Sequence, residues 1–286
     1  MGRKIVALIE VHSLTYTYPG ADRPTLVDIS FEVSEGEFIV LTGPSGCGKS
    51  TLCRCLNGLI PHSYGGEFKG KVIVDGLNTL EHPVYVLAQK VGLVFQTPEN
   101  QLFCSTVEKE IAFGLENLGL PRDEILKRID EALELMDIKH IRYSSPEELS
   151  GGEQQKVAIA ACLAMKPKVL VLDEPTAHLD PLSAFRLLKT LEKLNQELNI
   201  AILLVEHRLD MVVESADRVM VMHEGKIIVD APPQQAFTKD IVREIGVGIP
   251  KVVKLYTELK SAGLSLGRPP LTPEHLAREL EVFLRR

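Results

Sequence analysis

The chain has 286 residues, enough for one large α/β domain or a medium-sized domain with a small appendage. Its composition, 45% hydrophobic and 25% charged, is typical of a globular protein, and the longest apolar runs are far shorter than the roughly 20 residues of a membrane helix. A net charge of -7 argues against a broad nucleic-acid-binding surface, so we expect no nucleic-acid partner.

The start of the chain and the cysteines indicate the compartment. In "MGRKIVALIEVHS" a brief apolar run is interrupted by Glu10 and His12, so we expect a first strand and not a signal peptide. The five cysteines lack paired Cys-x-x-Cys spacing and their number is odd, so we expect free or buried thiols. Both features favour the cytoplasm.

Short apolar runs predict the fold class. Four of them, "FIVLT", "VGLVF", "VLVLD" and "AILLVEH", are typical of strands buried on both faces of a parallel sheet that helices cover. The opening third has "IVALIEV", "ISFEV" and "KVIVDG" between Gly- and Pro-containing turns, which favours short, partly antiparallel strands. The predicted class is α/β, with a mostly parallel core sheet and an antiparallel subdomain.

Two helical regions are expected outside this sheet. Between residues 105 and 136 apolar residues recur at helical spacing, and Ser105 and Glu108 are placed to form a capping box. We therefore expect a helical subdomain over about residues 97–160, inside a larger domain of residues 1–235. After a hairpin with Glu224 and Gly225 at its turn, residues 236–286 form a predicted C-terminal helical extension, with Thr272 as an N-cap. The pattern leaves open whether this extension only packs against the domain.

The most specific motif is "LTGPSGCGKST", which lies between a predicted strand and a predicted helix and matches G-x-x-x-x-G-K-[ST]. The N–H groups of such a loop and the N-terminus of the next helix favour bound phosphate. Lys49 can reach the β- and γ-phosphates, Ser50 offers a hydroxyl to Mg²⁺, and Thr51 supports the α-phosphate side. The predicted cofactor-binding residues are Gly43, Pro44, Ser45, Gly46, Cys47, Gly48, Lys49, Ser50 and Thr51.

Two carboxylates follow the buried strand "VLVLD". Asp173 at the strand end is placed to hold Mg²⁺ through water, and Glu174, one residue later, can orient or deprotonate an attacking water. In many proteins two acidic residues at a strand end form only a solvated turn. The phosphate loop in the same chain favours the catalytic interpretation.

A second anion site is indicated by "ELSGGEQQKVAIAACLAM". Ser150, Gly151 and Gly152 stand at the start of a predicted helix, where bare N–H groups and a hydroxyl could bind a phosphate. The phosphate loop already occupies the near side of one nucleotide. The residues alone therefore do not tell whose phosphate this second site binds.

Taken together, "GPSGCGKST", "LSGGEQQ" and "VLVLDEPTAHLD" make about residues 5–235 resemble the ATP-binding-cassette (ABC) ATPases. In that family two cassettes pack head to tail, and the signature motif of one closes over the γ-phosphate held by the other. The resemblance implies ATP and Mg²⁺ as cofactors and a second ABC ATPase subunit, the same chain or a paralogue, as a partner. It also implies that Ser150, Gly151, Gly152 and Glu153 contact nucleotide.

Further site residues follow from the resemblance alone. Tyr18 matches the aromatic residue that stacks on adenine, and Gln96 matches the glutamine that contacts Mg²⁺ and the attacking water. Asp180 matches the loop through which the two cassettes communicate, and His207 matches the switch histidine that senses the γ-phosphate. Without the resemblance, an exposed Tyr or a lone His in these contexts would more often be structural.

The chain departs from the family pattern at two positions that carry no catalytic group. Lys156 stands where many members have Arg, and Glu206 precedes the switch histidine where Thr is frequent. The predicted catalytic residues are Glu174, His207 and Gln96, and the predicted metal-binding residues are Ser50, Gln96 and Asp173.

The segment "FQTPENQLFCSTVEKEIAFGLENLGLP" is similar to the part of energy-coupling-factor (ECF) importer cassettes that receives a membrane scaffold, and the tail resembles their C-terminal pairing extension. The resemblance implies a vitamin or transition-metal importer with a scaffold subunit and a substrate-binding membrane subunit. The chain would then lie at the cytoplasmic side of the cell membrane. A conventional ABC importer of amino acids or metal ions and a soluble, non-transport ABC ATPase remain alternatives.

Overall fold

The computed structural model describes residues 7–264 and 266–284. Ile5 and Val6 of the predicted first strand lie outside the described residues. The strands are β1 (Ala7–Thr17), β2 (Leu26–Ser34), β3 (Phe38–Thr42), β4 (Glu67–Val74), β5 (Leu77–Asn78), β6 (Val91–Val94), β7 (Val169–Asp173), β8 (Ala201–Val205), β9 (Arg218–His223) and β10 (Lys226–Ala231). The helices are α1 (Lys49–Leu56), α2 (Leu59–His62), α3 (Val84–Leu87), α4 (Val107–Asn117), α5 (Arg122–Leu135), α6 (Gly151–Ala164), α7 (Pro181–Leu198), α8 (Pro233–Ala236), α9 (Asp240–Glu244), α10 (Lys251–Ser261) and α11 (Pro273–Leu284).

A six-stranded sheet in the order β10-β9-β3-β8-β7-β6 forms the centre of the molecule. All its neighbouring strands run parallel except β9 and β10, which form an antiparallel hairpin. Every residue of β3, β6, β7 and β8 is buried, as strands covered on both faces should be. The α/β prediction with a mostly parallel sheet is therefore confirmed.

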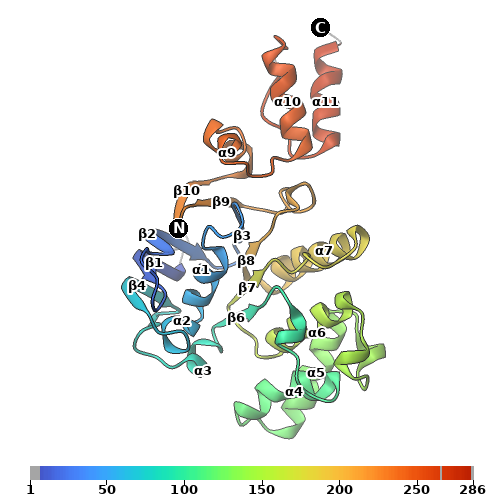
Figure 1. Cartoon of the computed structure of the whole chain (residues 1–286). Coiled ribbons are helices and arrows are strands. Elements are labelled where there is room, and N and C mark those ends of the chain that lie inside the picture. The colour runs from blue at the N-terminus through green and yellow to red at the C-terminus, as the bar shows by residue number, and fades with distance from the viewer. Residues whose placement is uncertain (1–6, 265, 285–286) are drawn as a thin grey trace, which may run out of the picture.

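The two faces of this sheet belong to two hydrophobic clusters. Ile39 and Leu41 of β3 pack with α1 and with the antiparallel sheet β2-β1-β4-β5. Phe38 and Val40, on the opposite face, pack with α6 and α7 and share their cluster with α4, α5 and the C-terminal helices. Figure 1 shows α1 and α7 on the two sides of the sheet. The parallel strands consequently carry their loops to one edge, between two covering layers.

The helices α4, α5 and α6 pack against one another, and the cap of α4 differs from the prediction. Thr106, not Ser105, is the N-cap, and its hydroxyl accepts a hydrogen bond from the Lys109 N–H at 3.3 Å. The Glu108 carboxylate is engaged elsewhere, because Arg142 donates to it at 2.9 Å. The predicted Ser105–Glu108 capping box is therefore wrong.

The C-terminal helices lie at the opposite end of the molecule from α4 and α5 (Figure 1). The chain reaches them through the predicted β9–β10 hairpin, whose turn residues Glu224 and Gly225 have φ values of 45° and 76°. Thr272 accepts a hydrogen bond from the His275 N–H at 3.2 Å, as expected of the N-cap of α11. None of the described helices combines the length and the apolar character that a membrane crossing requires.

Candidate active site

The phosphate loop connects the end of β3 to α1, and its shape depends on glycine. Gly43 has φ 154°, and a Cβ there would collide with the main-chain oxygen of Met222. Lys49 is only 5% exposed, and its Nζ donates to the carbonyl oxygens of Gly43 at 2.9 Å and Pro44 at 3.0 Å. Its ammonium group is thus folded over the loop, facing the ends of the neighbouring strands.

Tyr18 lies at the other side of this loop. Its hydroxyl is 3.1 Å from the Thr51 hydroxyl, and Arg54 Nη1 donates to it at 3.4 Å. Its ring packs edge-on against Tyr64, with ring centroids 6.3 Å apart, and Tyr64 is 41% exposed. Arg54 and Tyr64 belong to no motif, so the sequence could not identify them as neighbours of Tyr18.

Asp173, the last residue of β7, is a buried carboxylate with unused hydrogen-bonding capacity. Burial raises its pKa, and a hydrogen bond from Ser50 acts in the opposite direction. Its Oδ1 has no hydrogen-bond partner among the described residues. An orphaned carboxylate oxygen beside a hydroxyl suits a hard cation such as Mg²⁺. The described residues include no cluster of three His, Cys, Asp or Glu side chains that could hold a metal, so such an ion would need further ligands from phosphate.

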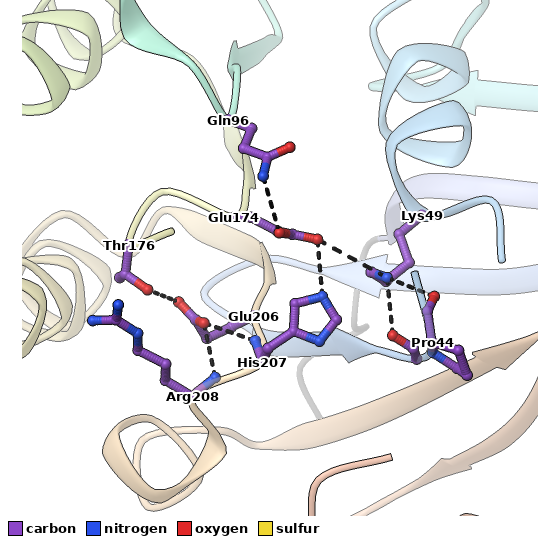
Figure 2. Close-up of polar contacts among 9 residues, drawn as sticks. Pro44, Lys49, Gln96, Glu174, Thr176, Glu206, His207 and Arg208 are labelled. Atoms are coloured by element: carbon purple, nitrogen blue, oxygen red, sulfur yellow. Dashed lines mark hydrogen bonds and ion pairs between the residues drawn. The ribbon is translucent and has the colours of Figure 1, made fainter. Parts of the chain in front are cut away.

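Glu174 is the point on which the other predicted catalytic residues converge (Figure 2). Gln96 Nε2 donates to its Oε2 at 3.3 Å, His207 Nε2 lies 2.9 Å from its Oε1, and Lys49 Nζ lies 4.0 Å from the same oxygen. These side chains come from the loops after β6, β7 and β8 and from the phosphate loop. Glu174 itself has φ 50°, a conformation uncommon outside glycine and frequent at functional sites.

Glu206, which the sequence marked only as a departure from a pattern, lies behind this cluster. Its side chain is buried, and its Oε2 accepts a hydrogen bond from the Thr176 hydroxyl at 2.5 Å. Its Oε1 accepts the main-chain N–H groups of His207 at 2.7 Å and Arg208 at 2.9 Å (Figure 2). Its partner Thr176 stands thirty positions earlier in the chain, which no local pattern reveals.

The predicted second anion site is the exposed N-terminus of α6. Ser150 and Glu153 form a complete capping box, in which Glu153 Oε2 accepts the Ser150 N–H at 2.9 Å and the Ser150 hydroxyl at 2.6 Å. That interaction lowers the pKa of Glu153. A Cβ on Gly151 would meet nothing within 4 Å, so the fold of this chain does not itself require glycine there.

Asp180 caps α7, accepting the N–H groups of Leu182 at 2.9 Å and Ser183 at 3.1 Å. Within the described part of the chain, Ser150 bonds to Glu153, and Asp180 bonds to Leu182 and Ser183. None of these hydrogen bonds involves Lys49, Glu174 or His207. The structure thus brings together Lys49, Gln96, Asp173, Glu174 and His207, with Ser50 beside Asp173. It leaves the α6 and α7 N-termini outside this cluster.

Comparison with known proteins extends over almost the whole chain. The family model for the ABC transporter matches residues 26–177. A Pyrococcus horikoshii protein that carries the provisional name of an ABC transporter ATP-binding protein is 50% identical over 275 residues, covering 96% of each chain. The energy-coupling factor transporter ATP-binding protein EcfA2 of Clostridium tetani is 41% identical over 281 residues, covering 95% of this chain and 96% of that protein.

Solved structures show the same fold. Clostridium perfringens cbiO1, described as part of the ABC transporter complex cbiONQ, superposes with a TM-score of 0.74 at 34% identity and covers 89% of this chain and 99% of its own. The ATP-binding cassette MJ0796, a dimer bound to ADP and phosphate, superposes with a TM-score of 0.69 at 26% identity and covers 79% of this chain and 98% of its own.

Proposed function

The chain belongs to the ABC transporter family and is an ATPase subunit of an ABC transporter, and we propose that it drives an importer of the energy-coupling-factor type. Three observations support this type. The segment from Phe95 to Pro121 resembles that of ECF cassettes, EcfA2 is 41% identical over nearly the full length, and cbiO1, described as part of the ABC transporter complex cbiONQ, is 34% identical. The cargo class would be a vitamin or a transition-metal ion.

ATP binding is assigned to the phosphate loop, from Gly43 to Thr51, with Tyr18 against adenine. The loop N–H groups and the Lys49 ammonium suit the phosphates, because both are hydrogen-bond donors held in place before the ligand arrives. Ser50, Asp173 and Gln96 would hold Mg²⁺, which when bound neutralises phosphate charge. The buried, unpartnered Oδ1 of Asp173 supports this assignment.

Hydrolysis is assigned to Glu174, and the observation that carries the assignment is the convergence of Gln96, His207 and Lys49 on its carboxylate. Gln96 holds one carboxylate oxygen and His207 the other, so the group is fixed in orientation. An oriented carboxylate can accept a proton from water as that water attacks the γ-phosphate. Gln96 is then placed to hold the water, and His207 to respond to the γ-phosphate.

The complete catalytic unit would be a head-to-tail dimer with a second cassette. Ser150, Gly151 and Gly152 are then donors to the nucleotide of the partner, and Asp180 lies in the loop that faces it. The space around Gly151 supports this, because an open, glycine-lined helix N-terminus suits the close approach of a phosphate from another molecule. Residues 236–286 would form the extension that helps the two cassettes pair, beside the domain of residues 1–235.

The membrane scaffold would dock on an aromatic patch formed by Phe103 and Phe113. These rings are 66% and 45% exposed and pack edge-on with centroids 4.8 Å apart, within the proposed helical subdomain of about residues 97–160. Exposed aromatic pairs commonly mark binding surfaces. A separate membrane subunit would recognise the cargo, and this chain would sit at the cytoplasmic side of the cell membrane.

Affinity purification from detergent-solubilised membranes of the source cells tests the proposal. We expect a second cassette, one small scaffold protein and one substrate-binding membrane protein to co-purify with the tagged chain. A variant with Phe103→Ser and Phe113→Ser serves as the matched control and should lose the membrane proteins only. Recovery of permease subunits without a substrate-binding membrane protein would indicate a conventional importer. Recovery with ribosomes or DNA and no membrane protein would contradict every transport role.

A further inference from the structure

Glu206 is a buried carboxylate to which none of the roles above assigns a task. It follows the last residue of β8 and is 3% exposed. A buried carboxylate is costly unless hydrogen bonds compensate for its lost hydration. The partners of Glu206 therefore indicate why this position carries an acid.

Those partners belong to the two segments that carry Glu174 and His207. Thr176, two residues after Glu174, donates its hydroxyl to Glu206 Oε2 at 2.5 Å. The main-chain N–H groups of His207 and Arg208 donate to Oε1 at 2.7 Å and 2.9 Å. One side chain thus ties the loop after β7 to the loop after β8 (Figure 2).

The side-chain hydrogen bonds of Glu206 hold the backbone directly after the point where the hydrogen bonds of the sheet end. The sheet register of β8 ends at Val205, which aligns with Leu41 of β3 and Asp173 of β7, and the Glu206 N–H donates to the Leu41 carbonyl at 3.1 Å. Beyond this point the backbone N–H of His207 is held by the Glu206 carboxylate. The carboxylate therefore fixes the backbone from which the imidazole extends.

That fixation matters because the His207 side chain is 42% exposed, and only a defined backbone keeps its Nε2 within 2.9 Å of Glu174 Oε1. We propose that Glu206 is a positioning residue for ATP hydrolysis, which holds His207 against the Glu174 carboxylate through Thr176 and the His207 backbone. This inference rests on the roles proposed above for Glu174 and His207.

The segment that this carboxylate holds also contacts the loop before α7. Arg208, whose N–H it accepts, donates Nη2 to the Leu179 carbonyl at 3.0 Å, directly before Asp180. Glu206 therefore lies between the hydrolytic pair and the loop assigned to contact with the partner cassette. Its loss should disturb turnover more than ATP binding, since Lys49 keeps its own contacts.

Two substitutions separate the hydrogen bonds of the Glu206 side chain from its negative charge. Glu206→Ala removes all three acceptor interactions. We expect kcat to fall roughly 10- to 100-fold, because small misplacements of reacting groups slow a reaction by such factors. Glu206→Gln should rescue kcat to within about threefold of wild type, because its carbonyl can accept both N–H groups while its amide donates to Thr176. In both variants the KM for ATP should stay within about twofold of wild type.

A double-mutant cycle with His207→Ala distinguishes positioning from general support. If Glu206 acts through His207, adding Glu206→Ala to His207→Ala should lower kcat no further. Glu37→Ala is the matched control, because Glu37 is a largely buried carboxylate that accepts the Ser34 N–H at 2.9 Å and pairs with Arg218 at 2.9 Å. It should lower the thermal midpoint of unfolding without changing kcat per folded molecule.

The outcomes separate this inference from the function on which it rests. Wild-type turnover in Glu174→Gln would overturn both. A dead Glu174→Gln combined with wild-type kcat in Glu206→Ala, or with fully additive losses in the cycle, would overturn only the positioning role. If Glu206→Ala does not fold, Thr176→Val removes one bond alone and should lower kcat several-fold; wild-type kcat there would equally contradict the proposal.

Discussion

Two regions of the molecule are held in place by different means: the proposed catalytic cluster of Lys49, Gln96, Glu174 and His207, and the aromatic patch of Phe103 and Phe113. In the catalytic cluster, polar groups from four separate loops bond to one another, and the Glu174 carboxylate has a partner on each oxygen. In the patch, two exposed rings contact each other edge-on. The first arrangement fixes geometry for chemistry, whereas the second leaves apolar surface available to another molecule.

One loop joins these two regions and is anchored along its length. Gln101 donates to the Leu93 carbonyl at 3.2 Å and accepts the Phe95 N–H at 3.1 Å. The Glu110 carboxylate accepts the N–H groups of Phe103 at 3.0 Å and Cys104 at 2.7 Å. Because Gln96 begins this loop and Phe103 ends it, a shift at the nucleotide can reach the patch through a bonded segment. The two regions should nevertheless be separable by mutation.

The largest effect should follow from Glu174→Gln. The amide keeps the shape of the side chain but cannot accept the proton, so we expect kcat to fall by about 10²- to 10⁴-fold. ATP binding should persist, and the variant should accumulate as a nucleotide-bound dimer, which size-exclusion chromatography with ATP would detect. Unchanged ATPase activity would rule out the assigned role.

A smaller effect is expected from Lys49→Ala, which removes a buried ammonium group from the proposed phosphate site. The affinity for ATP should fall roughly 10- to 100-fold, the size expected for one charge-assisted interaction. Binding of a fluorescent ATP analogue would measure it. Lys193→Ala is the control, since Lys193 forms an exposed pair with Glu197 at 3.8 Å, and this variant should bind ATP as wild type does. Wild-type affinity in Lys49→Ala would contradict the assignment.

Much of the fold could be predicted because the decisive information is local. The runs that become β3, β6, β7 and β8 are apolar throughout and are wholly buried, and the phosphate loop lies between the strand and the helix that its motif requires. The Glu224–Gly225 turn and the Thr272 cap were likewise predictable from residues beside them.

Predictions failed where a distant side chain competes. Ser105 and Thr106 are adjacent hydroxyls, and the box with Glu108 does not form because Arg142, 34 positions away, binds that carboxylate. The hydrogen bonds of Glu206 could not be predicted for the same reason, since its hydroxyl donor Thr176 is distant in sequence. The roles of the α6 N-terminus and of Asp180 involve a second molecule, so they stay predictions.

The smallest effect, and the most selective one, is expected from the aromatic patch. Phe103→Ser combined with Phe113→Ser removes two exposed rings, while Leu102, which packs against the core, is left in place. We expect transport in reconstituted vesicles to fall about tenfold, the effect of losing an interface anchor that contributes more than about 1 kcal/mol. ATPase activity of the isolated cassette should not change, because neither ring contacts the catalytic cluster.

The control for that variant is Leu80→Ser, which removes an apolar side chain that is 38% exposed after β5 and so lies outside both regions. It should transport at the wild-type rate, which excludes a general effect of lost surface hydrophobicity. If the double phenylalanine variant also transported normally, the patch would have no coupling role. If it lost ATPase activity as well, the two regions would not be separable, and the bonded loop would support the catalytic geometry itself.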